Sequence, residues 1–185
     1  MFFCGRGVDR NPELAVKYLE MSASAEFGEA DCLLGICLEN GTGCERNLPE
    51  AVRHYKIACE QRVVEAWYRY GACLETGRGT ECNIVEAARY YRLAAEDDWH
   101  EAEISYGLCL LYGKGVDVDE KSAAEYFRRA AEAGLSDGEL FYGMCLRRGL
   151  GLDKDLEAAQ VYIERAALQG NEMAIRAYEG LGLDQ

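Results

Sequence analysis

The amino-acid sequence predicts an all-α protein, a solenoid of helix-turn-helix repeats with a 36-residue period and about nine helices. Two observations predict this fold: pairs of glycine recur at a fixed spacing, and the segments between them place apolar residues on one face of a helix. The pairs have the form Gly-x-Gly and begin at Gly5, Gly41, Gly77, Gly113 and Gly149. One pair alone is weak evidence, whereas five in perfect register indicate an array of one structural unit.

Other residues recur with the same period and define the interior of the unit. One column is alanine, at Ala15, Ala51, Ala87, Ala123 and Ala159. A second is glycine, at Gly35, Gly71, Gly107 and Gly143. A third holds a large side chain, at Leu34, Tyr70, Tyr106, Tyr142 and Tyr178. Glycine inside a helix costs about 1 kcal/mol against alanine, so these small columns predict that the two helices of each unit approach closely.

The unit of residues 64–99 shows how each element is specified. Its first helix covers about 64–75, where the repeating apolar positions fall on one stripe. Gly77 ends this helix, since glycine tolerates the left-handed conformation of a C-cap. Asn83 then stands where an N-cap belongs, because its side chain can accept hydrogen bonds from free amide groups. The second helix, about 84–96, places small and aromatic residues at i, i+3, i+4 and i+7, namely Ala87, Tyr90, Tyr91 and Ala94.

The repeat extends over residues 1–185 as a single array, because one hairpin cannot bury both of its apolar faces and neighbouring units must stack. Its divisions are a partial unit 1–27, full units 28–63, 64–99, 100–135 and 136–170, and a partial unit 171–185. The chain begins inside one unit and ends with a first helix at about 171–180. We therefore expect a fragment of a longer array, or a chain that associates through its open ends.

Charge and apolar content exclude several classes of partner. A formal net charge of −13 argues against binding to nucleic acids or anionic membranes, where lysine and arginine must neutralise phosphates. The acidity serves solubility, or it selects basic partners. No run of apolar residues is long enough for a membrane span. The N-terminal residues also lack the basic start and apolar run of a signal peptide, so we expect a cytoplasmic protein.

The pattern of one unit matches a known repeat most closely between Ala102 and Gly134. The matching segments are Tyr106-Gly107, Gly113-Lys114-Gly115-Val116, Ala123-Ala124-Glu125-Tyr126-Phe127 and Ala130-Ala131-Glu132-Ala133-Gly134. The pattern resembles the Sel-one-like repeat (SLR), a relative of the tetratricopeptide repeat, over nearly the whole chain. The resemblance implies an α/α right-handed superhelix and a role as scaffold or adaptor in protein complexes. The chain departs from the pattern where Glu26, Arg62 and Asp98 replace the loop glycine found at 134 and 170.

Nine cysteines are present, an odd number that cannot all pair within the chain. Neighbouring parallel helices lie about 8–10 Å apart, too far for a disulfide, so one column of cysteines is interpreted as buried apolar filler: Cys37, Cys73, Cys109 and Cys145. A secreted, cysteine-rich branch of the family bridges cysteines eight residues apart, but Trp67 occupies the position that would pair with Cys59. Approach of Cys32 to Cys59, or of Cys44 to Cys82, remains open. Mostly reduced thiols favour the cytoplasm.

No catalytic or metal-binding motif is found. His54 replaces an aromatic residue of the repeat and is interpreted as a packed substitute, and His100 lies between two helices. The sequence lacks C-x-x-C, H-E-x-x-H and G-K-[ST] patterns, so we expect no cofactor, no metal and no enzymatic activity. Two alternatives stay open: a hydrolase of the β-lactam-binding type claimed for the cysteine-rich branch, and a structural segment of a larger signalling protein.

The resemblance places the partner-binding residues on the first helix of each unit, which lines the concave face in tetratricopeptide-like arrays. The acidic residues Glu65, Glu101 and Asp137, with Glu29, would form a ladder along one rim. The apolar floor would consist of Tyr68, Ile104, Leu108, Leu111, Tyr112, Leu140 and Met144. The remaining candidates are Glu75, Arg147 and Arg148. Some of the apolar residues could instead pack between helices. A protein or peptide with basic and apolar residues suits such a groove.

Overall fold

The computed structural model describes residues 11–23 and 27–181. The helices of this part of the chain are α1 (Pro12–Ala23), α2 (Gly28–Asn40), α3 (Leu48–Glu60), α4 (Val64–Thr76), α5 (Ile84–Glu96), α6 (His100–Tyr112), α7 (Glu120–Glu132), α8 (Ser136–Arg148), α9 (Leu156–Leu168) and α10 (Glu172–Leu181). The described residues contain no strand, which confirms the all-α class. Ten helices are present rather than about nine, because the partial units at both ends each add one helix to the four full units.

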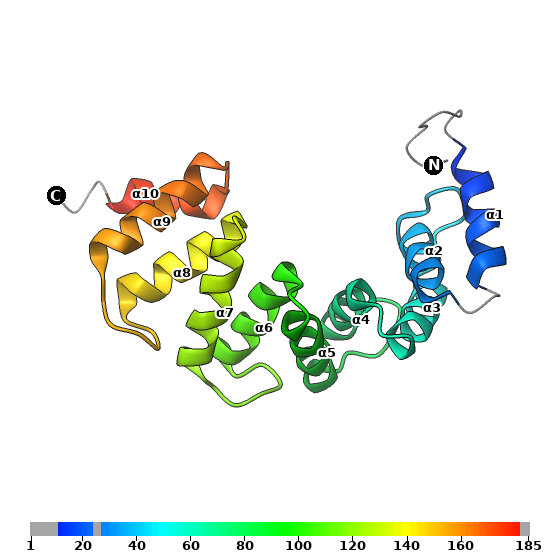
Figure 1. The fold of residues 1–185 in the computed structure, drawn as a ribbon, viewed down its shortest axis with the longest axis horizontal. Helices are drawn as coiled ribbons and strands as arrows, with labels where there is room; N and C mark the ends of the chain where they lie inside the picture. The colour runs from blue at the N-terminus through cyan, green and yellow to red at the C-terminus, as the bar shows by residue number, and fades with distance from the viewer. Residues whose placement is uncertain (1–10, 24–26, 182–185) are drawn as a thin grey trace. The chain divides into compact units, whose positions relative to one another are not determined.

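The chain divides into two compact units, residues 1–93 and 94–185. In the first, α1 packs on α2, α2 on α3 and α3 on α4 (Figure 1). In the second, successive helices from α6 to α10 pack in the same neighbour-on-neighbour order. Contacts between sequence neighbours are the hallmark of a repeat array, since each hairpin buries its apolar faces against the next.

The Gly-x-Gly turns have the two roles that their spacing predicts. The first glycine of each turn is the left-handed C-cap of a first helix, with φ between 66° and 73° at Gly41, Gly77, Gly113 and Gly149. The second glycine lies against the beginning of the preceding second helix. A Cβ on Gly79 would lie 2.5 Å from the carbonyl oxygen of Leu48. The glycines are therefore required for the geometry of the chain at each turn.

The polar column after each turn caps the second helix, as predicted. The side chains of Asn47, Asp119 and Asp155 each accept a hydrogen bond from the amide three residues later, at 3.2, 3.0 and 2.9 Å. Asn11 and Asn83 do the same. Each cap satisfies one of the amide groups that the first turn of a helix leaves without an intrahelical partner.

The mid-helix glycine column marks where the two helices of a unit touch. A Cβ on Gly35 would lie 2.6 Å from the Tyr55 ring, and one on Gly107 would lie 2.6 Å from the Phe127 ring. The column of large residues packs beside this contact. Tyr70 meets the edge of Tyr90 with ring centroids 4.9 Å apart, and two further tyrosine pairs repeat this geometry. The predicted close approach within each hairpin is confirmed.

Candidate interaction surfaces

The residues predicted to bind a partner lie on three first helices. Helix α4 carries Glu65, Tyr68 and Glu75, helix α6 carries Glu101, Ile104, Leu108, Leu111 and Tyr112, and helix α8 carries Asp137, Leu140, Met144, Arg147 and Arg148. Glu101, Tyr112, Asp137 and Arg148 are exposed, and most of the others are half-buried. The set therefore divides into surface residues and residues shared with the hairpin interior.

Four of these residues come together around one cavity in the second unit. Leu111 and Tyr112 from the end of α6, and Met144 and Arg148 from α8, line a space of about 190 Å³. Its wall is completed by Glu120, Phe141, Cys145 and Leu150. Tyr112 is 61% exposed, a high value for a large aromatic residue. The cavity thus combines aliphatic, thioether and aromatic groups with one arginine at its edge.

Two predicted members of the apolar floor belong to the core instead. Leu140 is 1% exposed and packs with Ile163, Ala166 and Ala174. Ile104 is 9% exposed. Both positions follow the register of the first helices, but they fall on the side that meets neighbouring helices, so they cannot contact a partner without rearrangement of the core.

The predicted acidic ladder is partly engaged within the chain. Glu65 pairs with Arg69 at 2.8 Å on the same helix. Asp137 accepts a hydrogen bond of 2.6 Å from the Nδ2 group of Asn171. Glu75 accepts one of 2.8 Å from the hydroxyl of Tyr91, which ties α4 to α5. Glu101 is exposed. Among these acids, Glu75 has a clear structural role, because its partner comes from the second helix of its own hairpin.

Comparison with known proteins identifies the repeat. The model of the Sel1 repeat matches residues 1–27, 28–63, 64–98, 100–135 and 136–171. The chain belongs to the Sel1 repeat family. The crystal structure of a Sel1 repeat protein from Oxalobacter formigenes is similar to it, with 33% identity and a TM-score of 0.89, over 97% of this chain and 72% of that one.

Two further solved structures resemble the chain to different extents. A protective antigen of uropathogenic Escherichia coli with an SLR fold is 25% identical, with a TM-score of 0.86, over 94% of this chain but only 37% of its own. The cysteine-rich protein B of Helicobacter pylori is 26% identical, with a TM-score of 0.55, over 71% of this chain and 95% of its own. Comparison with curated proteins gave no match.

The Sel1 units of this chain share a buried position that sequence reasoning missed. Asp31, Trp67, Glu103 and Glu139 stand 36 residues apart and are all buried. The carboxylates of Glu103 and Glu139 each have an arginine from the following second helix, Arg129 at 2.6 Å and Arg165 at 2.8 Å. The other carboxylate oxygen of each acid has a different partner. The Oε2 atom of Glu103 lies 2.9 Å from the Nδ1 atom of His100, and that of Glu139 accepts a hydrogen bond of 2.7 Å from the side-chain amide of Gln169. The 36-residue register applied to charged residues could have found these pairs.

The Sel1 repeat of residues 64–98 replaces this pair with apolar groups. Trp67 stands in the place of the acid, and Leu93 in the place of the arginine. The indole Nε1 of Trp67 donates to the carbonyl of Cys59 at 3.2 Å. In the repeat of residues 100–135, the Nη2 group of Arg129 donates to the equivalent carbonyl, that of Ala95, at 2.9 Å. The tryptophan therefore supplies the hydrogen bond of the arginine without bringing a charge.

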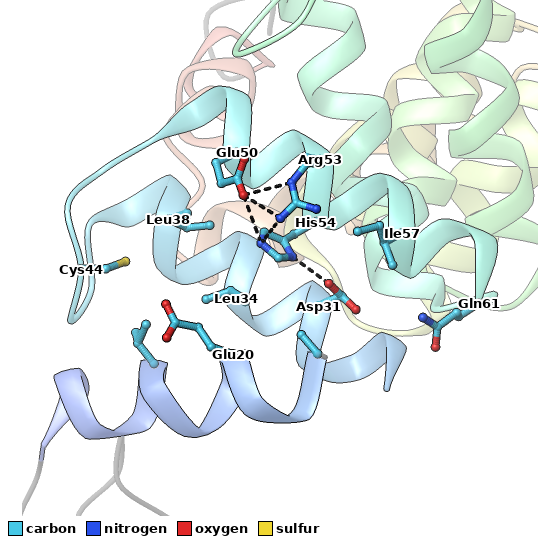
Figure 2. Close-up of a pocket in the computed structure, with 12 residues that line it drawn as sticks. Glu20, Asp31, Leu34, Leu38, Cys44, Glu50, Arg53, His54, Ile57 and Gln61 are labelled. Carbon is cyan, nitrogen blue, oxygen red and sulfur yellow. Dashed lines mark hydrogen bonds and ion pairs between the residues drawn. The ribbon is translucent and has the colours of Figure 1, made fainter. Parts of the chain in front are cut away.

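The Sel1 repeat of residues 28–63 has a third arrangement, and it corrects the interpretation of His54. His54 is buried as expected, but it is more than a packed aromatic substitute, because its Nδ1 donates to the Oδ1 of Asp31 at 2.7 Å. Figure 2 shows this pair on the wall of a cavity of about 540 Å³, which is lined by residues of α1, α2 and α3. Arg53 lies at its edge and pairs with Glu50 at 2.6 Å.

The same cavity bears on the hydrolase alternative, because Cys44 also lines it. A catalytic cysteine beside a histidine has a lowered pKa, since the thiolate is the nucleophile. Here burial raises the pKa of the Cys44 thiol, and the charge of Glu20 raises it further. The environment thus disfavours the thiolate.

The repeating column of cysteines follows the packing interpretation. All cysteines in the described part of the chain are free, and Cys37, Cys73, Cys109 and Cys145 are buried. Neither the approach of Cys32 to Cys59 nor that of Cys44 to Cys82 forms a disulfide. Over residues 11–23 and 27–181, no three histidine, cysteine or acidic side chains are grouped so that they could hold a metal ion. No helix of the same residues is long and apolar enough to cross a membrane.

Proposed function

We propose that this Sel1 repeat chain is an interaction scaffold that binds a partner protein or peptide through its first helices. The cavity between α6 and α8 carries the proposal. The cavity has a volume of about 190 Å³ and lies beside the exposed ring of Tyr112, and Leu111 and Met144 form part of its wall. Aromatic and methionine side chains are enriched at protein interfaces, and energetically dominant contacts are usually apolar anchors in such pockets. An apolar side chain of the partner suits this space.

The charge on the same helices indicates how the partner is oriented. Glu101 and Asp137 stand in the first turns of α6 and α8, whereas Arg148 stands at the end of α8. The charges also complement the helix dipoles, which stabilises the helices themselves. A partner with an apolar anchor in the cavity and basic residues toward the first turns would match both features. The net charge of −13 favours the approach of such a partner.

The proposal is tested with peptides selected from a random library on the immobilised chain. We expect enriched peptides that combine basic and apolar residues. Their dissociation constants are then measured for the wild type, Tyr112→Ala and Met144→Ala. Each substitution removes part of the cavity wall, so we expect binding to weaken about tenfold, as for a typical hot spot.

Val161→Ala is the matched control, because Val161 is an exposed apolar residue on the second helix α9. It should leave the dissociation constant within about twofold of the wild type, the effect of a surface substitution. Charge reversal at Glu101 and Asp137 should weaken binding of the basic peptides and reduce its dependence on salt. Equal affinity of the Tyr112 variant, the Val161 variant and the wild type would contradict the proposal.

A further inference from the structure

Among the described residues, the buried carboxylate of Asp31 has no ion pair with an arginine, whereas its counterparts Glu103 and Glu139 each have one. Its side chain is 3% exposed. The Oδ1 atom accepts from His54, but the Oδ2 atom is buried and has no hydrogen-bond partner. Figure 2 shows one oxygen facing the His54 ring and the other pointing away from it. Burying a carboxylate oxygen without a hydrogen-bond partner costs more folding free energy than burying a neutral oxygen in the same way, because a charge has been removed from water.

The equivalent acids show what is missing at this position. The Oε1 atom of Glu103 has the guanidinium of Arg129 at 2.6 Å, and that of Glu139 has Arg165 at 2.8 Å. Both arginines stand in one column of the repeat, where the first unit has Ile57. The chain therefore builds the same acidic position three times and supplies the arginine twice.

The arginine that lines the cavity, Arg53, does not fill this gap. Arg53 directs its guanidinium to Glu50, with Nε and Nη2 at 2.9 and 2.6 Å from Oε1. Its Nη2 group also lies 3.2 Å from the Nε2 atom of His54, on the side of the ring away from Asp31. Arg53 is thus held by two acceptors at the rim of the cavity, and the second oxygen of Asp31 stays unpaired.

A space of suitable size and chemistry adjoins the unpaired oxygen. Asp31 lines the cavity of about 540 Å³ between α1, α2 and α3, a volume within the range of ligand pockets. Its aliphatic wall is formed by Val16, Ala23, Leu34, Leu38 and Ile57. Its acids, Glu20, Asp31 and Glu50, outnumber its one arginine. Ala23, which lines the cavity, occupies the same position of the repeat as Ala95, whose carbonyl accepts a hydrogen bond from Arg129. An aliphatic stem that ends in a guanidinium matches this arrangement.

We propose that this cavity binds the arginine side chain of a partner protein, which takes the place beside Asp31 that Arg129 and Arg165 take beside Glu103 and Glu139. The guanidinium pairs with the Oδ2 atom, and the methylene stem lies on the aliphatic wall. This site is separate from the cavity between α6 and α8. It rests on the proposed function only in that the arginine belongs to a protein partner.

The probe is N-acetyl-arginine methylamide, and its neutral control is the citrulline analogue of the same shape. Binding is followed by NMR chemical shifts of the backbone amides. We expect saturable shifts around Asp31, His54 and Ile57 with the arginine probe, and at least tenfold weaker binding of the citrulline analogue. Equal binding of the two compounds, or shifts without a focus on these residues, would overturn the proposal.

Two variants test separately whether binding of the arginine probe needs the charge of Asp31 and the open space beside it. Asp31→Asn keeps the shape of the side chain and should weaken binding of the arginine probe at least tenfold. Ile57→Arg restores the arginine of the later units within the chain, so it should abolish binding and raise the midpoint of thermal unfolding. Ile57→Leu is its control and should bind as the wild type does. If Ile57→Arg still binds the probe at the same amides, the assignment is wrong.

Two comparisons identify the source of the guanidinium and keep the proposals apart. Free arginine carries two further charges that a residue within a chain lacks, so it should bind more weakly than the blocked probe. Tighter binding of free arginine would point to a small metabolite and overturn the assignment to a protein partner. Tyr112→Ala should leave arginine binding unchanged. Failure of the arginine probe with intact peptide binding at Tyr112 would refute this site alone.

Discussion

The Nη2 atom of Arg129 lies 2.6 Å from the buried Oε1 of Glu103 and also donates to the carbonyl of Ala95. This one side chain joins α7, α6 and the end of α5 within the compact unit of residues 94–185. The same position of the repeat holds Ile57, Leu93 and Arg165 in the other Sel1 repeats. The repeat therefore tolerates a charged pair, an apolar pair or an open cavity at one structural position.

Replacing the pair Glu103 and Arg129 by the residues found at the same positions in another repeat, Trp67 and Leu93, should restore at least half of the unfolding free energy that Arg129→Leu alone removes. Arg129→Leu leaves Glu103 buried with one oxygen unpaired and should cost about 3 kcal/mol of unfolding free energy. The double variant Glu103→Trp with Arg129→Leu reproduces the pair Trp67 and Leu93, and we expect it to recover at least half of that loss. Urea denaturation of the four proteins of the cycle measures the coupling. A double variant no more stable than Arg129→Leu would show that the two solutions are not interchangeable.

A second pair of positions changes together from repeat to repeat: a tyrosine on the second helix accompanies a glutamate on the first helix. Tyr91 donates to Glu75 at 2.8 Å and Tyr55 to Glu39 at 2.7 Å, whereas the third unit has Phe127 opposite Leu111. Tyr91→Phe should cost about 1 kcal/mol, because the hydrogen bond to a half-buried carboxylate is lost. Phe127→Tyr should also destabilise, since it brings a hydroxyl to a position without the acid. Thermal unfolding measures both, and a neutral Tyr91→Phe would contradict the structural role of Glu75.

The buried thiols should make the fold sensitive to alkaline pH. Burial raises the pKa of Cys73 from 9.0 to about 11, and that of Cys145 to about 11. The folded state thus holds these protons more tightly, so their contribution to stability is complete below pH 9 and is lost as the pH rises toward about 11. Unfolding free energy measured from pH 8 to pH 11 should fall, and Cys73→Ala should show a shallower fall. An identical slope for Cys73→Ala would exclude the thiol as a cause.

The loop residues Arg62 and Asp98 adopt a left-handed conformation that suits glycine better than the residue present. Arg62 has φ of 61°, and the equivalent Gly134 has φ of 84°. Arg62→Gly should raise unfolding free energy by about 0.5–1 kcal/mol, because an L-residue pays about 1–2 kcal/mol for this region while glycine loses some entropy on folding. Gly134→Arg is the reciprocal change and should destabilise by a similar amount. Stabilisation by Gly134→Arg would refute this assignment.

The register predicted most of the fold, because it depends on residues whose roles are local. The left-handed turn at Gly77, the cap at Asn83 and the close contact of Gly107 with Phe127 each follow from one residue type at a repeating place. The described residues form ten helices, close to the predicted number of about nine. For Ile104 and Leu140 the structure selects the alternative that some floor residues pack between helices, which sequence spacing alone could not decide.

The candidate sites were predicted in part. Tyr112 and Arg148 are exposed and line one cavity, and their role in binding a partner stays a prediction. The pairing of His54 with Asp31 was missed, because the two residues are 23 positions apart and belong to different columns. Comparison of the buried acid between units was needed to see that Asp31 lacks the arginine present beside Glu103 and Glu139.

The scaffold role rests on binding through the first helices, and hydrogen exchange of the complex tests it most directly. Deuterium uptake is measured by mass spectrometry for the free chain and for the chain saturated with a selected basic and apolar peptide. We predict that the peptide slows exchange in α6 and α8, most strongly near Tyr112 and Met144. Slower exchange confined to the second helices α7 and α9, with α6 and α8 unchanged, would contradict the account.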